Sequence, residues 1–96
     1  MARLRRTSDA RNDLTAIWLY IAQDNLPAAD RLMDEIDRTL ELLLSFPLMG
    51  EAVSQLRTGV RRVMVGNYQL FYEQTADGIR LLRVYHAARR IEDLFS

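Results

Sequence analysis

The spacing of hydrophobic residues in the first half of the chain predicts two amphipathic helices. In the first helix, apolar positions recur at i, i+3, i+4 and i+7 and form one stripe: Leu14, Ile17, Trp18 and Ile21. Ser8 or Asp9 is expected to cap its first turn, and the helix should end near Asp24. Its place in the stripe makes Trp18 a packing residue.

The second helix is expected to start at Pro27, because the first helical position needs no amide donor. It should end before Phe46-Pro47, since a residue that precedes proline avoids helical angles. Its apolar face is wide: Ala29, Leu32, Met33, Ile36, Leu40, Leu43 and Leu44. The connection between the two helices is short, so they should be antiparallel neighbours.

From residue 60 onward the pattern changes to that of β-strands. Residues 60–65, 68–74 and 79–86 are β-rich, and the tight turns Gly66-Asn67 and Asp77-Gly78 separate them. These segments should form an antiparallel meander. Alternation divides each strand between the two faces of the sheet.

Alternation places the side chains of the second and third strands of the meander as follows. Tyr68, Leu70 and Tyr72 should share one face, with Gln69, Phe71 and Glu73 on the other. Arg83 and Tyr85 should likewise lie opposite Leu82, Val84 and His86.

Three further segments complete the prediction. Residues 2–7 form a short first strand, residues 47–58 a connection without periodic structure, and residues 87–95 a short terminal helix. The resulting order is β-α-α-β-β-β-(α), an α+β fold with a helical hairpin packed on a small, mainly antiparallel sheet. The length of 96 residues fits one domain over residues 1–96.

Composition excludes several kinds of site. The chain has no cysteine, so it has no disulfide, thiolate zinc site or cysteine nucleophile. It contains no nucleotide-binding motif, and we predict neither a metal nor a cofactor. The basic start of the chain leads into no apolar run, and no stretch approaches the roughly 20 apolar residues of a membrane span. We therefore expect a cytoplasmic protein without a membrane segment.

The charges are unevenly distributed although the formal net charge is zero. Every one of the 13 basic residues is arginine, which binds anions well but is a poor proton donor. Residues 57–90 contain seven arginines and only two acidic residues. The arginines in this region therefore exceed the local acids, which indicates a surface for an acidic partner. Zero net charge argues against direct binding of DNA by the chain alone.

A series of short motifs runs through almost the whole chain. In order, they are Ile17-Trp18-x-Tyr20-Ile21-Ala22, Asp24-Asn25, Pro27-x-Ala29, Phe46-Pro47-x-Met49-Gly50, Leu56-Arg57-x-Gly59-Val60-Arg61, Val65-Gly66-Asn67-Tyr68-x-Leu70-Phe71-Tyr72 and Leu82-Arg83-Val84-x-His86-x-Ala88-Arg89-Arg90. Together they resemble ParE-type toxins of the RelE/ParE toxin–antitoxin superfamily, often described as plasmid stabilisation proteins. The chain departs from that pattern at Glu51 and Glu73, where such toxins favour arginine.

The resemblance implies a toxin component of a type II toxin–antitoxin module. Such a toxin is neutralised by a cognate ParD-like antitoxin, and family members with known targets inhibit DNA gyrase by protein–protein contact. The RelE-like branch instead cleaves messenger RNA on the ribosome. A family member that has lost its toxicity is a third alternative, in keeping with the two acidic departures.

Each of these functions would use a different set of residues. For target binding without catalysis, the candidate residues are Arg57, Arg61, Arg62, Arg83, Arg89 and Arg90. For the alternative ribonuclease, the catalytic candidates are Arg83, Tyr85 and His86, although the only histidine shares a face with apolar residues and the chain has no lysine. For the antitoxin, whose disordered tail should lie between helical hairpin and sheet, the candidates are Ile91, Leu94 and Phe95.

Overall fold

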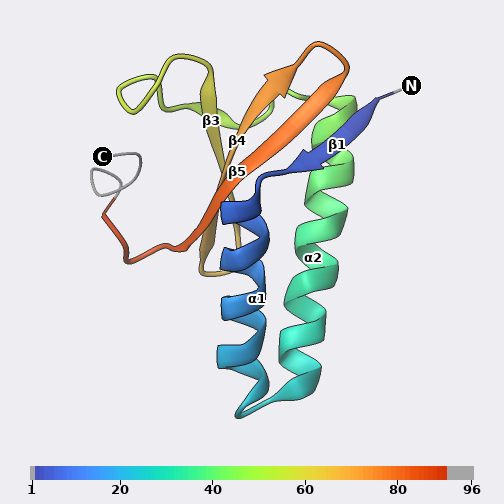
Figure 1. Ribbon diagram of the computed structural model, residues 1–96, viewed down its shortest axis with the longest axis vertical. Helices are drawn as coiled ribbons and strands as arrows, with labels where there is room; N and C mark the ends of the chain where they lie inside the picture. The colour runs from blue at the N-terminus through green and yellow to red at the C-terminus, as the bar shows by residue number, and fades with distance from the viewer. Residues whose placement is uncertain (1, 91–96) are drawn as a thin grey trace.

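The computed structural model describes residues 2–90, in which a helical hairpin packs on one face of a five-stranded sheet (Figure 1). The strand order is β1-β5-β4-β3-β2. β1 pairs with β5 in parallel, and every other pair is antiparallel. The elements are β1 (Arg3–Arg6), α1 (Ser8–Ala22), α2 (Leu26–Ser45), β2 (Glu51–Ala52), β3 (Val60–Val65), β4 (Tyr68–Thr75) and β5 (Gly78–His86). The predicted α+β fold is confirmed.

The caps of the two helices differ from the prediction in one respect. Thr7, rather than Ser8 or Asp9, caps α1: its backbone is extended, and its Oγ1 accepts a hydrogen bond from the Ala10 amide at 3.0 Å. The prediction was wrong because the chain turns directly from β1 into α1, which makes Ser8 the first helical residue. Asn25 caps α2 by accepting from the Ala28 amide at 3.0 Å.

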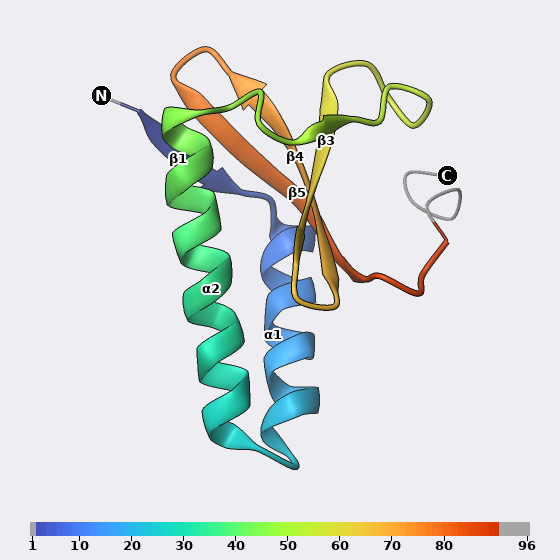
Figure 2. The same ribbon diagram turned by 180° about the vertical axis from the view of Figure 1, so that it is seen from behind.

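The main core lies between the helices and the sheet. The predicted faces of β4 are confirmed, because Tyr68, Leu70 and Tyr72 pack toward the helices while Phe71 packs on the opposite face. The helical hairpin extends past the sheet in both views (Figures 1 and 2). Trp18 therefore lies half-buried outside the main core, and its Nε1 donates to Asp30 at 2.9 Å. Within the described residues, no helix is long and apolar enough to cross a lipid bilayer.

A second, smaller core covers the other face of the sheet. It contains Val53, Val60, Phe71, Leu82 and Tyr85, with Leu56 at its margin. The segment 47–58, predicted as a connection with little periodic structure, supplies Val53 and Leu56 and also contains strand β2. A two-residue strand is too short for periodicity to reveal, so β2 was missed.

A β-bulge in β5 changes which residues share a face. Tyr72 pairs with Leu81 and Phe71 pairs with Arg83, which leaves Leu82 as the additional residue. Leu82 consequently packs in the second core with Tyr85, whereas Val84 packs in the main core. The prediction that Leu82 and Val84 share a face was wrong, because strict alternation does not continue through a bulge.

A terminal helix was predicted over residues 87–95, and the described part of that range, residues 87–90, is not helical. Ala87 and Ala88 form a turn after β5, and neither Arg89 nor Arg90 is helical. Ile91, Leu94 and Phe95, the predicted antitoxin contacts, lie outside the described residues.

Gly78 gives a prediction about the parallel pair of β1 and β5. A Cβ atom at this position would lie 1.9 Å from the carbonyl oxygen of Arg3, and backbone cannot yield as a flexible side chain does. We expect Gly78→Ala to separate β1 from β5 and lower the free energy of unfolding by about 1–3 kcal/mol or more. Urea unfolding followed by circular dichroism measures this loss.

Gly66 provides the matched control. Its φ is +56°, and no atom lies within 4 Å of the position that a Cβ atom would occupy, so Gly66→Asn should change stability by less than about 0.5 kcal/mol. Equal stability of Gly78→Ala and the parent chain would contradict the close approach of β1 to Gly78.

Candidate functional site

A groove with a volume of about 490 Å³ lies between α1 and the C-terminal end of β5. One wall is made by residues on one face of α1, and the other wall comes from β4, β5 and the turn that follows. The lining residues are Asp13, Ala16, Ile17, Tyr20, Tyr68, Val84, Tyr85, His86 and Arg89. Apolar and aromatic groups thus predominate, with a few polar groups among them.

Asp13 joins the two walls of the groove. Its carboxylate accepts from Arg83 Nε at 2.9 Å, from Arg83 Nη2 at 3.1 Å and from the Val84 amide at 3.0 Å. The hydrogen bonds to Asp13 raise the pKa of Arg83 above its ordinary value, so the guanidinium stays charged. Because its two nitrogens are held by one carboxylate, the Arg83 side chain has a fixed orientation.

Three tyrosines give the groove its aromatic character. Two guanidinium groups lie over the ring of Tyr85, that of Arg83 at 4.6 Å and that of Arg89 at 4.3 Å from its centroid. Burial raises the pKa of Tyr68, and the nearby Tyr20 raises it further. The Tyr68 phenol is therefore neutral near pH 7 and can donate a hydrogen bond.

His86 supports the turn after β5. Its Nδ1 accepts from the Ala88 amide at 3.0 Å, which places the proton of the neutral ring on Nε2. Its ring meets that of Tyr68 edge-on, with 5.3 Å between centroids. Arg83, Tyr85 and His86, the candidates for ribonuclease chemistry, thus lie near one groove, but each is engaged by partners within the protein.

Gln69 holds the same turn from the sheet. This buried residue of β4 donates from Nε2 to the carbonyl oxygens of His86 and Arg89, each at 3.1 Å. The backbone at the rim of the groove is therefore attached to the central strand of the sheet. Sequence reasoning treated Gln69 only as a residue of one sheet face.

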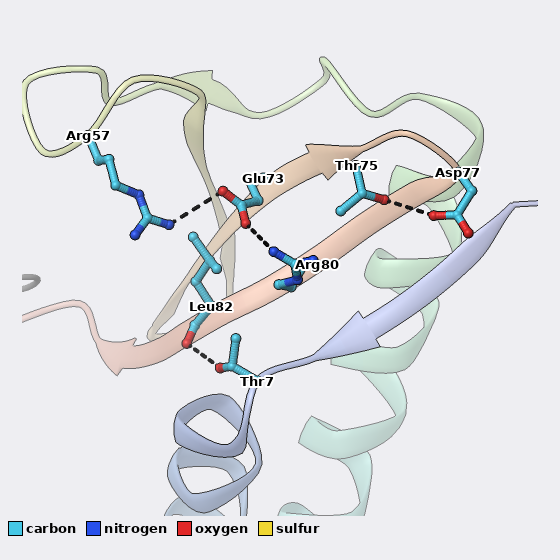
Figure 3. A network of polar contacts seen from close by, with 7 residues as sticks. All are labelled: Thr7, Arg57, Glu73, Thr75, Asp77, Arg80 and Leu82. Atoms are coloured by element: carbon cyan, nitrogen blue, oxygen red, sulfur yellow. Dashed lines mark hydrogen bonds and ion pairs between the residues drawn. The ribbon is translucent and has the colours of Figure 1, made fainter.

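The arginines assigned to target binding do not form one cluster. Glu73 lies between Arg57 and Arg80, with N–O distances of 3.4 and 2.9 Å (Figure 3). Arg62 pairs with Glu51, its Nε donating at 2.6 Å. Glu51 and Glu73, the two acidic residues at which the chain departs from the ParE pattern, thus both form ion pairs with arginines.

The remaining members of that set lie in different surroundings. Arg61 donates from Nη1 to the carbonyl oxygens of Leu48 and Gly50, at 3.2 and 2.7 Å. Arg83 and Arg89 lie at the groove, and Arg90 is the last described residue. The fold also supplies acids from outside residues 57–90, since it brings Asp13 to Arg83 and Glu51 to Arg62. Contact of these arginines with a target stays a prediction.

Asp13 and Tyr20 were missed as groove residues, although their spacing carried a signal. Together with Ala16 and Ile17 they fall at i, i+3, i+4 and i+7, a second helical stripe that overlaps the apolar one. Within residues 2–90, no group of three His, Asp or Glu side chains is placed to hold a metal ion.

Two solved structures share this fold. A chain from the chromosomal ParDE toxin–antitoxin system of P. aeruginosa matches with a TM-score of 0.74 and 21% identity, over 90% of this chain and 96% of that one. A chain of the E. coli DinJ–YafQ complex matches with a TM-score of 0.57 and 20% identity, over the full length of both. At this level of identity the two matches show that the fold is shared.

Sequence comparison defines the family. Residues 4–91 match the family described as ParE toxin of type II toxin–antitoxin system, parDE. Toxin ParE1 of Caulobacter vibrioides is 31% identical over 87 residues, 90% of each chain. Toxin ParE3 of the same organism is 27% identical over 85 residues, 88% of this chain and 85% of the relative. The chain belongs to the ParE toxin family, as the sequence motifs indicated.

Asp13 gives a prediction about the structure of the groove. Asp13→Asn keeps the size of the side chain but removes the negative charge that accepts hydrogen bonds from two Arg83 nitrogens and the Val84 amide. We expect a loss of about 1.5–3 kcal/mol in the free energy of unfolding, typical of hydrogen bonds to a charged group. Exposed Asp24 provides the control, since Asp24→Asn should change stability by less than about 0.5 kcal/mol. Equal effects of the two variants in urea unfolding would contradict the role of Asp13.

Proposed function

We propose that this chain is the toxin of a type II toxin–antitoxin module and inhibits DNA gyrase through protein–protein contact in the cytoplasm. The observation that carries the proposal is the match of residues 4–91 to the ParE toxin family. Inhibition requires only binding, and at the groove Asp13, Arg83 and His86 Nδ1 already have partners within the protein. A non-catalytic mode of action is consistent with this, because general acid–base chemistry needs groups that can reach a substrate.

The groove between α1 and β5 is the proposed site for the tail of a ParD-like antitoxin. Tyr20 and Tyr68 offer aromatic area with hydroxyl groups at the edges, a composition common in protein interfaces. Arg89 adds a positive charge for an acidic residue of the tail. A disordered tail would become ordered in such a groove, with its apolar side chains against α1.

The second candidate function is a RelE-like messenger-RNA endonuclease. It is favoured by one observation: Tyr85, His86 and Arg89 line a single groove. Against it, the Arg83 guanidinium is held by Asp13 and His86 Nδ1 accepts from a backbone amide. The third possibility, a non-toxic family member, is consistent with Glu73 and Glu51 neutralising neighbouring arginines.

A supercoiling assay tests the proposed activity. The purified chain should inhibit purified DNA gyrase, and addition of the ParD-like antitoxin should restore the enzyme. Expression of the chain alone in a bacterium should give filamentous cells. An RNA-cleavage assay with the same preparation is the control: RNA cleavage without gyrase inhibition would favour the endonuclease, and normal growth with neither effect would favour the non-toxic protein.

The groove itself is tested through Tyr20, which is exposed and makes little contribution to the core. Tyr20→Ser should weaken binding of the antitoxin at least tenfold, about 1.4 kcal/mol, because an aromatic contact is removed. Isothermal titration measures the affinity. Leu26→Gln, at the exposed turn between the helices and outside the groove, is the control and should bind as the parent does. Unchanged affinity of the Tyr20 variant would place the antitoxin elsewhere.

A further inference from the structure

The segment between α2 and β2 exposes an unusual amount of apolar surface. Phe46 is 59% exposed, Leu48 61% and Met49 49%. With Ser45, Pro47 and Gln74 they line a hollow of about 600 Å³. We refer to Phe46, Leu48 and Met49 as the apolar loop surface. Single exposed apolar residues are ordinary, but a contiguous group of large ones indicates an interaction site.

The backbone beneath this surface is firmly attached to the sheet. Tyr72 of β4 has a completely buried side chain, and its hydroxyl donates to the Pro47 carbonyl and accepts from the Gly50 amide, both at 2.9 Å. Arg61 of β3 donates to the carbonyls of Leu48 and Gly50. A Cβ atom at Gly50 would lie 2.6 Å from the Tyr72 hydroxyl, so only glycine allows the backbone to come this close to Tyr72.

A fixed apolar loop is favourable for binding. An interface that is already ordered loses little conformational entropy when its partner arrives, so more of the contact energy appears as affinity. The protein thus uses one fully buried tyrosine and one arginine to hold apolar side chains in solvent. Neither the main core nor the second core gains from that exposure.

The charge beside the loop defines the chemistry of the partner. Arg62, the next residue along β3, pairs with Glu51, but within residues 2–90 the Arg61 guanidinium forms no ion pair with a carboxylate. Its positive charge therefore lies next to the apolar loop surface without neutralisation. A protein segment that carries apolar residues and at least one carboxylate would be complementary to both features.

The position of the loop separates it from the groove. Figure 2 shows the chain leaving α2 at the end away from the α1–α2 turn and crossing toward β3. No residue lines both the hollow at the loop and the groove between α1 and β5. A tail bound in the groove would leave the loop to a different partner.

We propose that the apolar loop surface, with Arg61 beside it, is where the toxin contacts its target protein, through an apolar segment of the target that carries a carboxylate. This inference rests on the proposed function and adds the surface that carries it. A second copy of the chain is a less suitable partner. In a symmetric dimer the two Arg61 groups would approach each other, and the polar residues of the hollow, Ser45 and Gln74, are uncharged.

A pair of double variants tests the assignment. Leu48→Gln with Met49→Gln removes apolar area from the loop surface. Leu19→Gln with Leu26→Gln changes two leucines of similar exposure, 53% and 50%, near the α1–α2 turn. We expect the loop variant to require at least tenfold more protein for half-maximal inhibition of purified DNA gyrase. The control should stay within about twofold of the parent. Both should bind the antitoxin as the parent does and unfold at a similar temperature.

The outcomes separate the two proposals. If the parent chain inhibits gyrase and the loop variant inhibits it equally, the surface assignment is wrong and the proposed function stands. Loss of antitoxin binding by the loop variant would assign the surface to the antitoxin, and a parent dimer that the loop variant converts to a monomer would assign it to self-association; either overturns the inference. If the parent neither inhibits gyrase nor arrests growth, the proposed function itself fails.

Arg61 tests the charge of the partner. Arg61→Lys keeps the positive charge, whereas Arg61→Gln removes it and retains a hydrogen-bond donor. We expect Arg61→Gln to inhibit gyrase at least fivefold less well than Arg61→Lys, and to lose the dependence of inhibition on salt concentration. Equal inhibition by the two variants would show that the partner needs no carboxylate opposite Arg61.

Discussion

The attachment of α1 to β5 is the contact on which the remaining features depend. At the start of the helix, Thr7 donates from Oγ1 to the Leu82 carbonyl at 2.8 Å, as Figure 3 shows, and from its amide to the Leu81 carbonyl at 3.0 Å. Farther along the helix, Asp13 binds Arg83 and the Val84 amide. These contacts hold α1 against β5, and the groove lies between these two elements.

Strand β4 organises both proposed binding surfaces. Gln69 holds the turn that forms one rim of the groove, and Tyr72 holds the loop after α2. The two residues are three positions apart on one strand, yet one holds the turn after β5 and the other holds the loop after α2. Burial raises the pKa of Tyr72, which keeps its hydroxyl protonated and able to donate to Pro47. A central strand is a suitable support, because neighbours on both sides limit its movement.

The arginine-rich composition does not translate into a uniformly positive face. Asp13, Glu51 and Glu73 each engage arginines of residues 57–90, and of these three acids only Glu73 lies within that range. The more exposed pairs, those of Glu51 and Glu73, contribute little to stability, but they reduce the charge available to a partner. In the proposed interaction, recognition of the target depends on the apolar loop surface and the Arg61 charge beside it.

Local features of the sequence determined most of the elements. Helical spacing placed α1 and α2, Gly66-Asn67 placed the turn between β3 and β4, and the ordered motifs indicated the ParE family, because each of these depends on residues close together in the chain. The groove was only partly predictable: its position between hairpin and sheet was expected, and Tyr85 and His86 had been singled out, but Asp13 had not.

Tertiary structure alone decided the bulge at Leu82, the pairing of Asp13 with Arg83 and the attachment of the loop after α2 to Tyr72. Asp13 and Arg83 are 70 positions apart, and Tyr72 and Pro47 are 25 apart. Hydrophobic periodicity reports which way a side chain faces within its own element. It carries no information about the distant group that the side chain meets, and that is set only when sheet and helices pack together.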